Sequence, residues 1–201
     1  MSYTVLQILN AALVRCAYPT MIGNLYEGSR ASRIGLNIYA QTRDALLSEF
    51  DWSFARQTVS LGAPLKTAPA PGYGGTGWDP ATNPPMPWLY EYAYPDNCIN
   101  IRAVMPTPVF LPVQMPRVNI FAQGFDTLLG QKVVLTNLAN AIAIITAQTT
   151  NPEEWQDNDF VEALIDRLVV AYAKALGVDA ARLQLDERDA AASEAQASTL
   201  P

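Results

Sequence analysis

The sequence predicts an α+β fold: mainly an α-helical bundle made by N- and C-terminal helices, with a small antiparallel β insert and a long loop. Three observations lead to this prediction. Both ends of the chain show amphipathic helical periodicity, the middle shows strand-like alternation, and a proline- and glycine-rich stretch precedes the strands. We expect the 201 residues to form a single domain.

Two helices are expected in the N-terminal part. Apolar residues recur at spacings of three and four over residues 4–17, and Pro19 ends this pattern. Ser29 is a suitable N-cap for a second helix over residues 30–50. The side of this helix away from its apolar stripe carries Arg30, Arg33 and Arg43. These arginines predict either a solvated face or a contact between subunits.

A long exposed loop is predicted over residues 62–87, which are rich in Pro, Gly, Ala and Thr. Tyr73 and Trp78 lie in this stretch, and large aromatic side chains at a loop tip suggest a contact arm. The glycines of 72–78 superficially resemble a phosphate-binding loop. No strand precedes them and no helix follows, so a flexible loop is favoured.

The β insert is predicted over residues 88–147. Aromatic residues alternate before the turn at Pro95 and apolar residues alternate after it, so 88–104 should form a strand, a turn and a second strand. Residues 132–136 and 141–147 predict a hairpin around 137–140. Prolines in 106–116 suggest an edge or a crossover. Four or five short strands would need helices packed against them.

Two more helices are expected at the C-terminal end, over residues 159–176 and 179–196. Asp157 or Asn158 can cap the first of them, and Gly177 ends it. Residues 186–201 form a polar tail that should project from the domain or dock on another chain.

Composition indicates a soluble, globular protein, since 50% of the residues are hydrophobic and 16% are charged. No apolar run is long enough to cross a bilayer, so no membrane partner is expected. The N-terminus lacks the pattern of a secretion signal, which predicts synthesis in the cytoplasm. Cys16 and Cys98 match no metal or redox spacing and should be reduced thiols.

The chain contains no histidine, which excludes Ser-His-Asp and Cys-His relays and every histidine-containing metal site. We therefore expect no enzyme, no catalytic residues, no cofactor and no metal. One alternative stays open, a carboxylate-dependent glycan hydrolase whose acid pair would come from Glu91, Asp96, Glu153 or Asp157. Such an enzyme needs two carboxylates at a defined separation, which a sequence does not show.

Thirteen Lys and Arg against 19 Asp and Glu give a formal net charge of −6, so a basic surface that wraps nucleic acid is not expected. An acidic surface still suits a pore through which DNA slides, because attractive phosphate contacts would add friction.

The order of motifs resembles a known family, the gatekeeper-type tail tubular proteins, which are head-to-tail connectors of short-tailed bacteriophages. The helix over 30–50 leads directly into Trp52-x-Phe54, and Tyr94-Pro95-Asp96-Asn97-Cys98 follows between strands. Asn151-Pro152 with Trp155 and a helical pair from Phe160 complete the order. The resemblance spans residues 5–197.

The resemblance implies a structural virion protein, not an enzyme. Such adaptors form a ring of about twelve copies that docks on the portal protein, receives the tail nozzle or tail tube, and surrounds the genomic DNA without reading its sequence. The protein would be made in the host cytoplasm and reside in the neck or tail of the virion. Another phage ring protein, a stopper or terminator, is the alternative within this class.

Candidate partner-binding residues come from the predicted arm, the second helix and the C-terminal helix. They are Tyr73, Trp78, Arg30, Arg33, Arg43, Arg182, Leu185 and Arg188. The segment from Asp186 onward looks like the part that extends along the portal in such adaptors.

Overall fold

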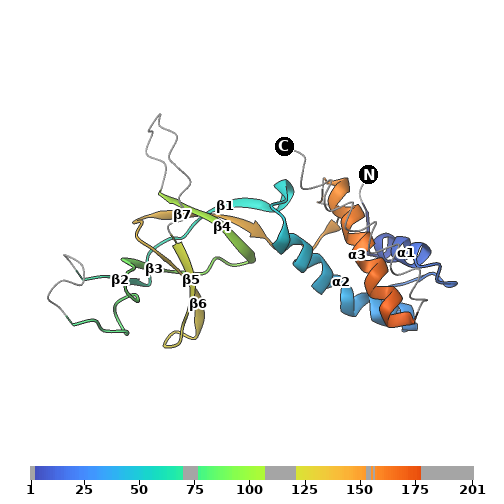
Figure 1. The fold of residues 1–201 in the computed structure, drawn as a ribbon, viewed down its shortest axis with the longest axis horizontal. Coiled ribbons are helices and arrows are strands. Elements are labelled where there is room, and N and C mark those ends of the chain that lie inside the picture. The colour runs from blue at the N-terminus through green and yellow to red at the C-terminus, as the bar shows by residue number, and fades with distance from the viewer. Residues whose placement is uncertain (1–2, 70–76, 107–120, 153–154, 156, 178–201) are drawn as a thin grey trace. The chain divides into compact units, whose positions relative to one another are not determined.

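The computed structural model describes residues 3–69, 77–106, 121–152, 155 and 157–177. The chain forms two compact units: a helical unit from Met1–Phe54 and Gln148–Pro201, and a β unit from Ala55–Ala147. The described residues contain three α-helices and seven strands in two antiparallel sheets (Figure 1). The prediction of a mainly helical bundle with a small β insert is therefore wrong. The strands build a unit with its own core.

The three helices begin at side-chain caps. Helix α1 (Val5–Arg15) starts with a capping box between Thr4 and Gln7. Helix α2 (Arg30–Glu49) is capped by Ser29, as the sequence suggested. Helix α3 (Asn158–Leu176) is capped by Asp157 and ends at Gly177, which has φ 76°. The helix expected over 179–196 lies outside the described residues.

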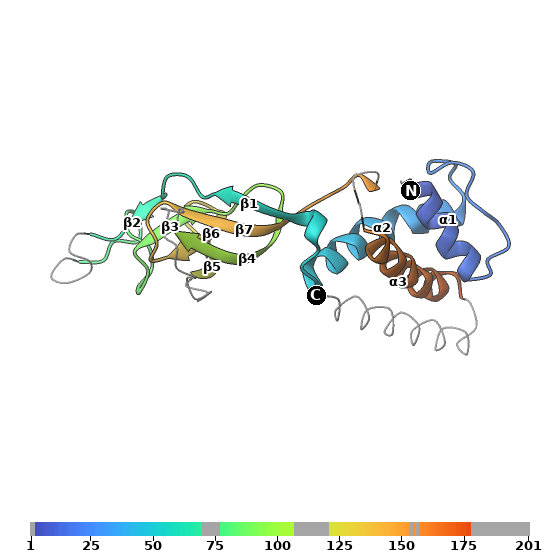
Figure 2. The same ribbon diagram turned by 90° about the horizontal axis from the view of Figure 1, so that it is seen from above.

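Helix α3 packs against both α1 and α2, and the buried apolar faces of the helices form the core of the helical unit (Figure 2). Gly35 allows α2 and α3 to approach closely. A Cβ atom at this position would lie 2.1 Å from Tyr172 Oη. Tyr172 is fully buried, and its hydroxyl donates a hydrogen bond to the Ala31 carbonyl at 3.3 Å.

The Trp52-x-Phe54 motif belongs to an aromatic cluster centred on Phe160, which is fully buried. The Phe160 ring lies 5.1 Å from Trp52, 5.0 Å from Phe54 and 4.8 Å from Trp155, all with edge-on geometry. Trp52 Nε1 also donates to the Leu46 carbonyl at 3.1 Å. These aromatic residues hold the end of α2 against the start of α3.

The β unit contains a three-stranded and a four-stranded sheet. The first has the order β1 (Arg56–Ser60), β7 (Ala141–Ala147), β4 (Cys98–Pro106). The second has the order β2 (Lys66–Thr67), β3 (Tyr90–Ala93), β6 (Gln131–Thr136), β5 (Phe121–Asp126). Both sheets contribute to one buried cluster: Leu61, Tyr92, Ile101, Val104, Val134, Ala141, Ala143, Ile145 and Ala147.

The strands on either side of Pro95 do not pair with each other. Strand β3 pairs with β2 and β6, whereas β4 pairs with β7 in the other sheet. The hairpin predicted around 137–140 is wrong for the same reason, because β6 and β7 also lie in different sheets. Both turns carry the chain between sheets, and Asn97 and Asn140 adopt positive φ there.

The expected alternation in β4 is interrupted by two register shifts, between Cys98 and Asn100 and between Ile101 and Ala103. As a result Ile101 and Val104 are buried, while Ala103 is half-buried. Strand β1 was not predicted, since four of its five residues are exposed and its sequence shows little alternation. Strand β5 contains Gly124, which also weakened the signal.

The arm predicted over 62–87 is partly folded. Strand β2 pairs Lys66 with Glu91 and Thr67 with Tyr90. The prolines of 107–116 and the residues 70–76 lie outside the described ranges. Within those ranges, no helix combines the length and hydropathy needed to cross a membrane.

Candidate functional site

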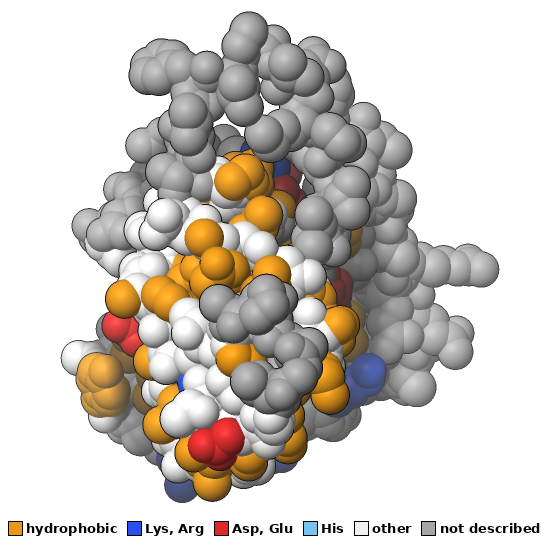
Figure 3. Space-filling view, turned by 90° about the vertical axis from the view of Figure 1, so that its left-hand side faces the viewer, with side chains coloured by type: hydrophobic (Ala, Val, Ile, Leu, Met, Phe, Trp, Pro, Cys, Tyr) orange, Lys and Arg blue, Asp and Glu red, His pale blue; other side chains and the backbone are white. Residues whose placement is uncertain are grey.

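Most of the large apolar side chains that are exposed in the described residues belong to the β unit. We use the name apolar surface for this set of exposed side chains: Leu65 (41% exposed), Trp78 (47%), Met86 (63%), Leu89 (38%), Phe125 (62%), Leu128 (62%) and Leu129 (49%). Figure 3 views the end of this unit that carries β2 and β3, where hydrophobic side chains are more widespread than charged ones. Exposed apolar side chains that are this widespread at one end of a unit are typical of a protein-binding surface.

The loop after residue 76 is held in shape by its own polar groups. The Asp79 carboxylate accepts hydrogen bonds from the Ala81 amide at 2.9 Å and from the Thr82 hydroxyl at 3.3 Å. The Asp79 amide donates to Asn83 Oδ1 at 3.1 Å. These contacts close a compact turn over residues 79–83.

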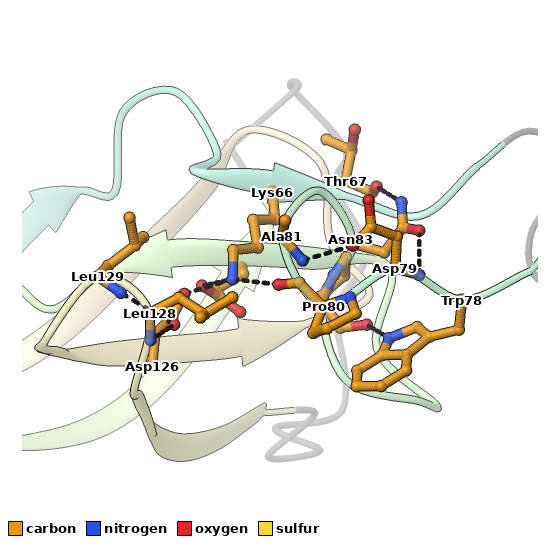
Figure 4. A network of polar contacts seen from close by, with 12 residues as sticks. Lys66, Thr67, Trp78, Asp79, Pro80, Ala81, Asn83, Asp126, Leu128 and Leu129 are labelled. Carbon is orange, nitrogen blue, oxygen red and sulfur yellow. Dashed lines mark hydrogen bonds and ion pairs between the residues drawn. The ribbon is translucent and has the colours of Figure 1, made fainter.

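This turn is fastened to β2 and supports Trp78 (Figure 4). Asn83 Nδ2 donates to the Thr67 carbonyl at 3.1 Å. Trp78 Nε1 donates to the Pro84 carbonyl at 2.9 Å. Because the indole N–H is already bonded, the exposed half of Trp78 offers an apolar ring to a partner.

A buried charge cluster joins the two parts of the apolar surface, which are the described residues of 65–89 (65–69 and 77–89) and residues 125–129. Lys66 Nζ lies 2.5 Å from Asp126 Oδ2 and 3.8 Å from Glu91 Oε1, and it donates to the Pro80 carbonyl at 2.8 Å. The exposed fractions of Lys66, Glu91 and Asp126 are 7%, 2% and 8%. Charges this deeply buried are retained only when they are paired.

Asp126 also shapes the turn between β5 and β6. Its Oδ1 accepts hydrogen bonds from the amides of Leu128 at 2.8 Å and Leu129 at 3.2 Å (Figure 4). Lys66 therefore connects the loop that carries Trp78 to the turn that carries two exposed leucines.

The two carboxyl groups of the cluster have opposite pKa shifts. The hydrogen bond from Lys66 is the main reason that the pKa of Asp126 lies well below its usual range. Burial, followed by the hydrogen bond with Asp126, raises the pKa of Glu91 to about 7. Glu91 is therefore the acid of the pair that holds a proton near neutral pH.

Such separated pKa values also occur in the acid pairs of glycosidases, but the geometry does not favour that chemistry here. Glu91 is 2% exposed, so a glycan could not reach it. Asp96 is exposed in the turn between β3 and β4, and Asp157 is the cap of α3. Glu153 lies outside the described residues. The acidic side chain close to Glu91 is Asp126, which the sequence analysis did not single out.

The predicted partner-binding arginines have different environments. Arg43 is 5% exposed, bonded to Asp44 at 2.7 Å and placed 5.8 Å from the centre of the Tyr39 ring, so it does not lie on the open face expected from the sequence. Arg30 Nη2 donates to the Ala175 carbonyl at 3.1 Å, near the end of α3. Arg33 is exposed.

Trp78 is the predicted contact residue that the structure places on the apolar surface. Tyr73, Arg182, Leu185 and Arg188 lie outside the described residues. The sequence analysis missed Lys66, Asp126 and the leucines of the β5–β6 turn. The adjacent leucines 128 and 129 directly before Gly130 were the available signal, because turns seldom carry two large apolar residues without a partner.

Within the described residues, no group of three or more Cys, Asp or Glu side chains could hold a metal ion. No protein-family model matches the sequence. No curated protein matches it either.

Proposed function

We propose that the protein is a structural head-to-tail adaptor of a short-tailed bacteriophage. In this role it forms a ring of about twelve copies, docks on the portal protein, and receives the tail nozzle or tail tube on its other side. Genomic DNA passes through the ring without sequence-specific contacts. The protein is made in the host cytoplasm and functions in the neck or tail of the virion.

The apolar surface is the observation that carries this proposal. Seven large apolar side chains are between 38% and 63% exposed, although the same unit buries a core of its own. Exposing them to water is unfavourable by roughly 25 cal/mol per Å² of apolar area, a cost that a partner surface would remove. Assembly with other proteins is the function that best accounts for them.

The sequence features behind the resemblance support the proposal from the helical unit. Trp52 and Phe54 follow α2 and pack on Phe160 at the start of α3, so the motif specifies a rigid corner between two helices. A rigid helical unit and a separate β unit with an apolar surface suit a protein that joins two different assemblies.

The net charge of −6 agrees with a channel through which DNA must slide. A basic lining would bind phosphates and slow the passage of the genome. Of the candidate arginines, Arg43 is neutralised by Asp44, whereas Arg30 and Arg33 are exposed.

The test is negative-stain microscopy of the purified protein mixed with the portal protein of the same virus. We expect a ring of added density on the portal. Absence of both a ring and added density would overturn the proposal. Binding to the tail tube and not to the portal would replace it with the stopper or terminator function.

A further inference from the structure

One ammonium group is buried with two carboxyl groups in the β unit. Lys66 comes from β2, Glu91 from β3 and Asp126 from the end of β5. Lys66 lies close to Asp126, at 2.5 Å, and farther from Glu91, at 3.8 Å. The buried oxygens Glu91 Oε1 and Asp126 Oδ2 both have their ionic contact with Lys66. A single cation therefore serves two acids, and it is placed to neutralise Asp126.

We infer that Lys66, Glu91 and Asp126 form a proton-dependent latch that holds residues 78–84 against the sheet while Glu91 is protonated and loosens when Glu91 loses its proton. The inference concerns the isolated chain and does not depend on the proposed function.

The latch follows from the charge balance of the cluster. With Glu91 protonated, the charges of Lys66 and Asp126 cancel, and Lys66 donates to the Pro80 carbonyl at 2.8 Å. With Glu91 ionised, the buried cluster carries a net charge of −1. The ammonium group is then drawn from 3.8 Å toward the second carboxylate, and its bond to Pro80, the one acceptor of the three that carries no charge, is the bond that lengthens.

Among the described residues, no charge other than those of Lys66 and Asp126 is in contact with Glu91 to compensate for its ionisation. On β6, the residue paired with Glu91 is Leu135. The loop carboxylate, Asp79, is bonded to Ala81 and Thr82. The β6 cation, Lys132, lies 5.5 Å from the centre of the Tyr94 ring. Lys66 and Asp126 are therefore the charged groups in contact with Glu91 among the described residues.

The latch controls how firmly the apolar surface is held. On one side it fixes Pro80, two residues from Trp78, and on the other it fixes the carboxylate that shapes the Leu128–Leu129 turn. The raised pKa of Glu91, about 7, places the change in the neutral range. A modest rise in pH would thus make the surface more mobile without unfolding the β core.

The Trp78 indole N–H reports directly on the latch, because it is bonded to the Pro84 carbonyl within the held segment. The experiment measures its exchange with water by ¹H–¹⁵N NMR between pH 5.5 and 8.5, with a Trp78→Phe spectrum for assignment. We expect exchange to rise by about tenfold more than hydroxide catalysis alone explains, with a midpoint near the titration of the Glu91 ¹³C carboxyl signal.

Glu91→Gln, a neutral isostere of the protonated acid, should abolish this extra rise and keep exchange slow at high pH. Asp96→Asn removes an exposed carboxylate of the same unit and should leave the wild-type profile unchanged. Lys66→Met should give fast exchange at every pH. A wild-type profile that follows hydroxide catalysis alone, or an extra rise that persists in Glu91→Gln, would overturn the latch.

Discussion

Replacing Gly35 with alanine tests the close packing of α2 on α3. The added Cβ would lie 2.1 Å from Tyr172 Oη and 3.0 Å from Leu9 Cδ1. The leucine methyl group can shift by a few tenths of an ångström. The Tyr172 ring cannot swing into water, because it is fully buried, so the helices must separate or the ring must leave its position.

The size of the effect follows from three contributions. Overpacking in a closed core costs about 1–3 kcal/mol. Loss of the Tyr172 hydrogen bond to the Ala31 carbonyl adds about 1 kcal/mol. Alanine gains about 1 kcal/mol over glycine inside a helix, which offsets part of this loss. We expect Gly35→Ala to lower the free energy of unfolding by about 1–3 kcal/mol.

Urea unfolding followed by circular dichroism measures this change, and Tyr172→Phe provides the matched control. Removing the hydroxyl takes away the atom that the new methyl group meets. The double variant Gly35→Ala with Tyr172→Phe should therefore lose less free energy of unfolding than the two single variants lose together. Strict additivity, or a Gly35→Ala variant as stable as wild type, would refute the packing argument.

Three further predictions concern the aromatic cluster, the charge cluster and the apolar surface. Phe160→Ala should lower the free energy of unfolding by about 3–5 kcal/mol, seen in urea unfolding, because a fully buried ring contacted by three aromatic side chains is lost. The native state holds the Glu91 proton up to about pH 7, whereas the unfolded chain releases it near 4.5. The free energy of unfolding should therefore fall across that range, by roughly 2 kcal/mol after solvent screening, and Glu91→Gln should remove the fall. The lowered pKa of Asp126 gives the opposite slope at acid pH, where stability is lost as that carboxylate is protonated. Leu128→Ser with Leu129→Ser should weaken binding to the portal protein or to the tail protein at least about tenfold in a pull-down titration. Met21 is a similarly exposed apolar residue of the helical unit, and Met21→Ser should leave this binding unchanged.

The helices could be placed from the sequence because their signals are local. Ser29 and Asp157 cap α2 and α3, and Gly177 ends α3 with a positive φ, at the positions that the pattern indicated. A cap and its helix lie within a few residues of each other. These helix signals can therefore be recognised without knowing any contact between residues far apart in the sequence.

The sheets could not be derived in the same way. Alternation in 88–104 identified extended segments, but it carries no information on which strand each one pairs with. The turn at Pro95 was therefore mistaken for the centre of a paired unit, although it carries the chain from one sheet to the other. This error made the β part look small and dependent on the helices, and the fold class followed from it.

The candidate site shows the same limit. Trp78 was identified because an aromatic residue in a proline- and glycine-rich loop is unusual by itself. Lys66 and Asp126 have no such local signal, since they are 60 positions apart and meet only when β2, β3 and β5 share a sheet. Their burial and their short separation are properties of the tertiary structure alone.

The charge cluster explains why the apolar surface can lie on loops. A loop that orders only on binding loses affinity, because the free energy of fixing its backbone must be subtracted from that of the contact. Buried ion pairs add little net stability, but their geometry is strict, so they fix position well. Lys66 supplies this fixed point for the loop of Trp78 and, through Asp126, for the Leu128–Leu129 turn. The aromatic strands around Pro95 contribute to the core of the unit, and buried polar residues beside them hold the loops that carry the exposed apolar side chains.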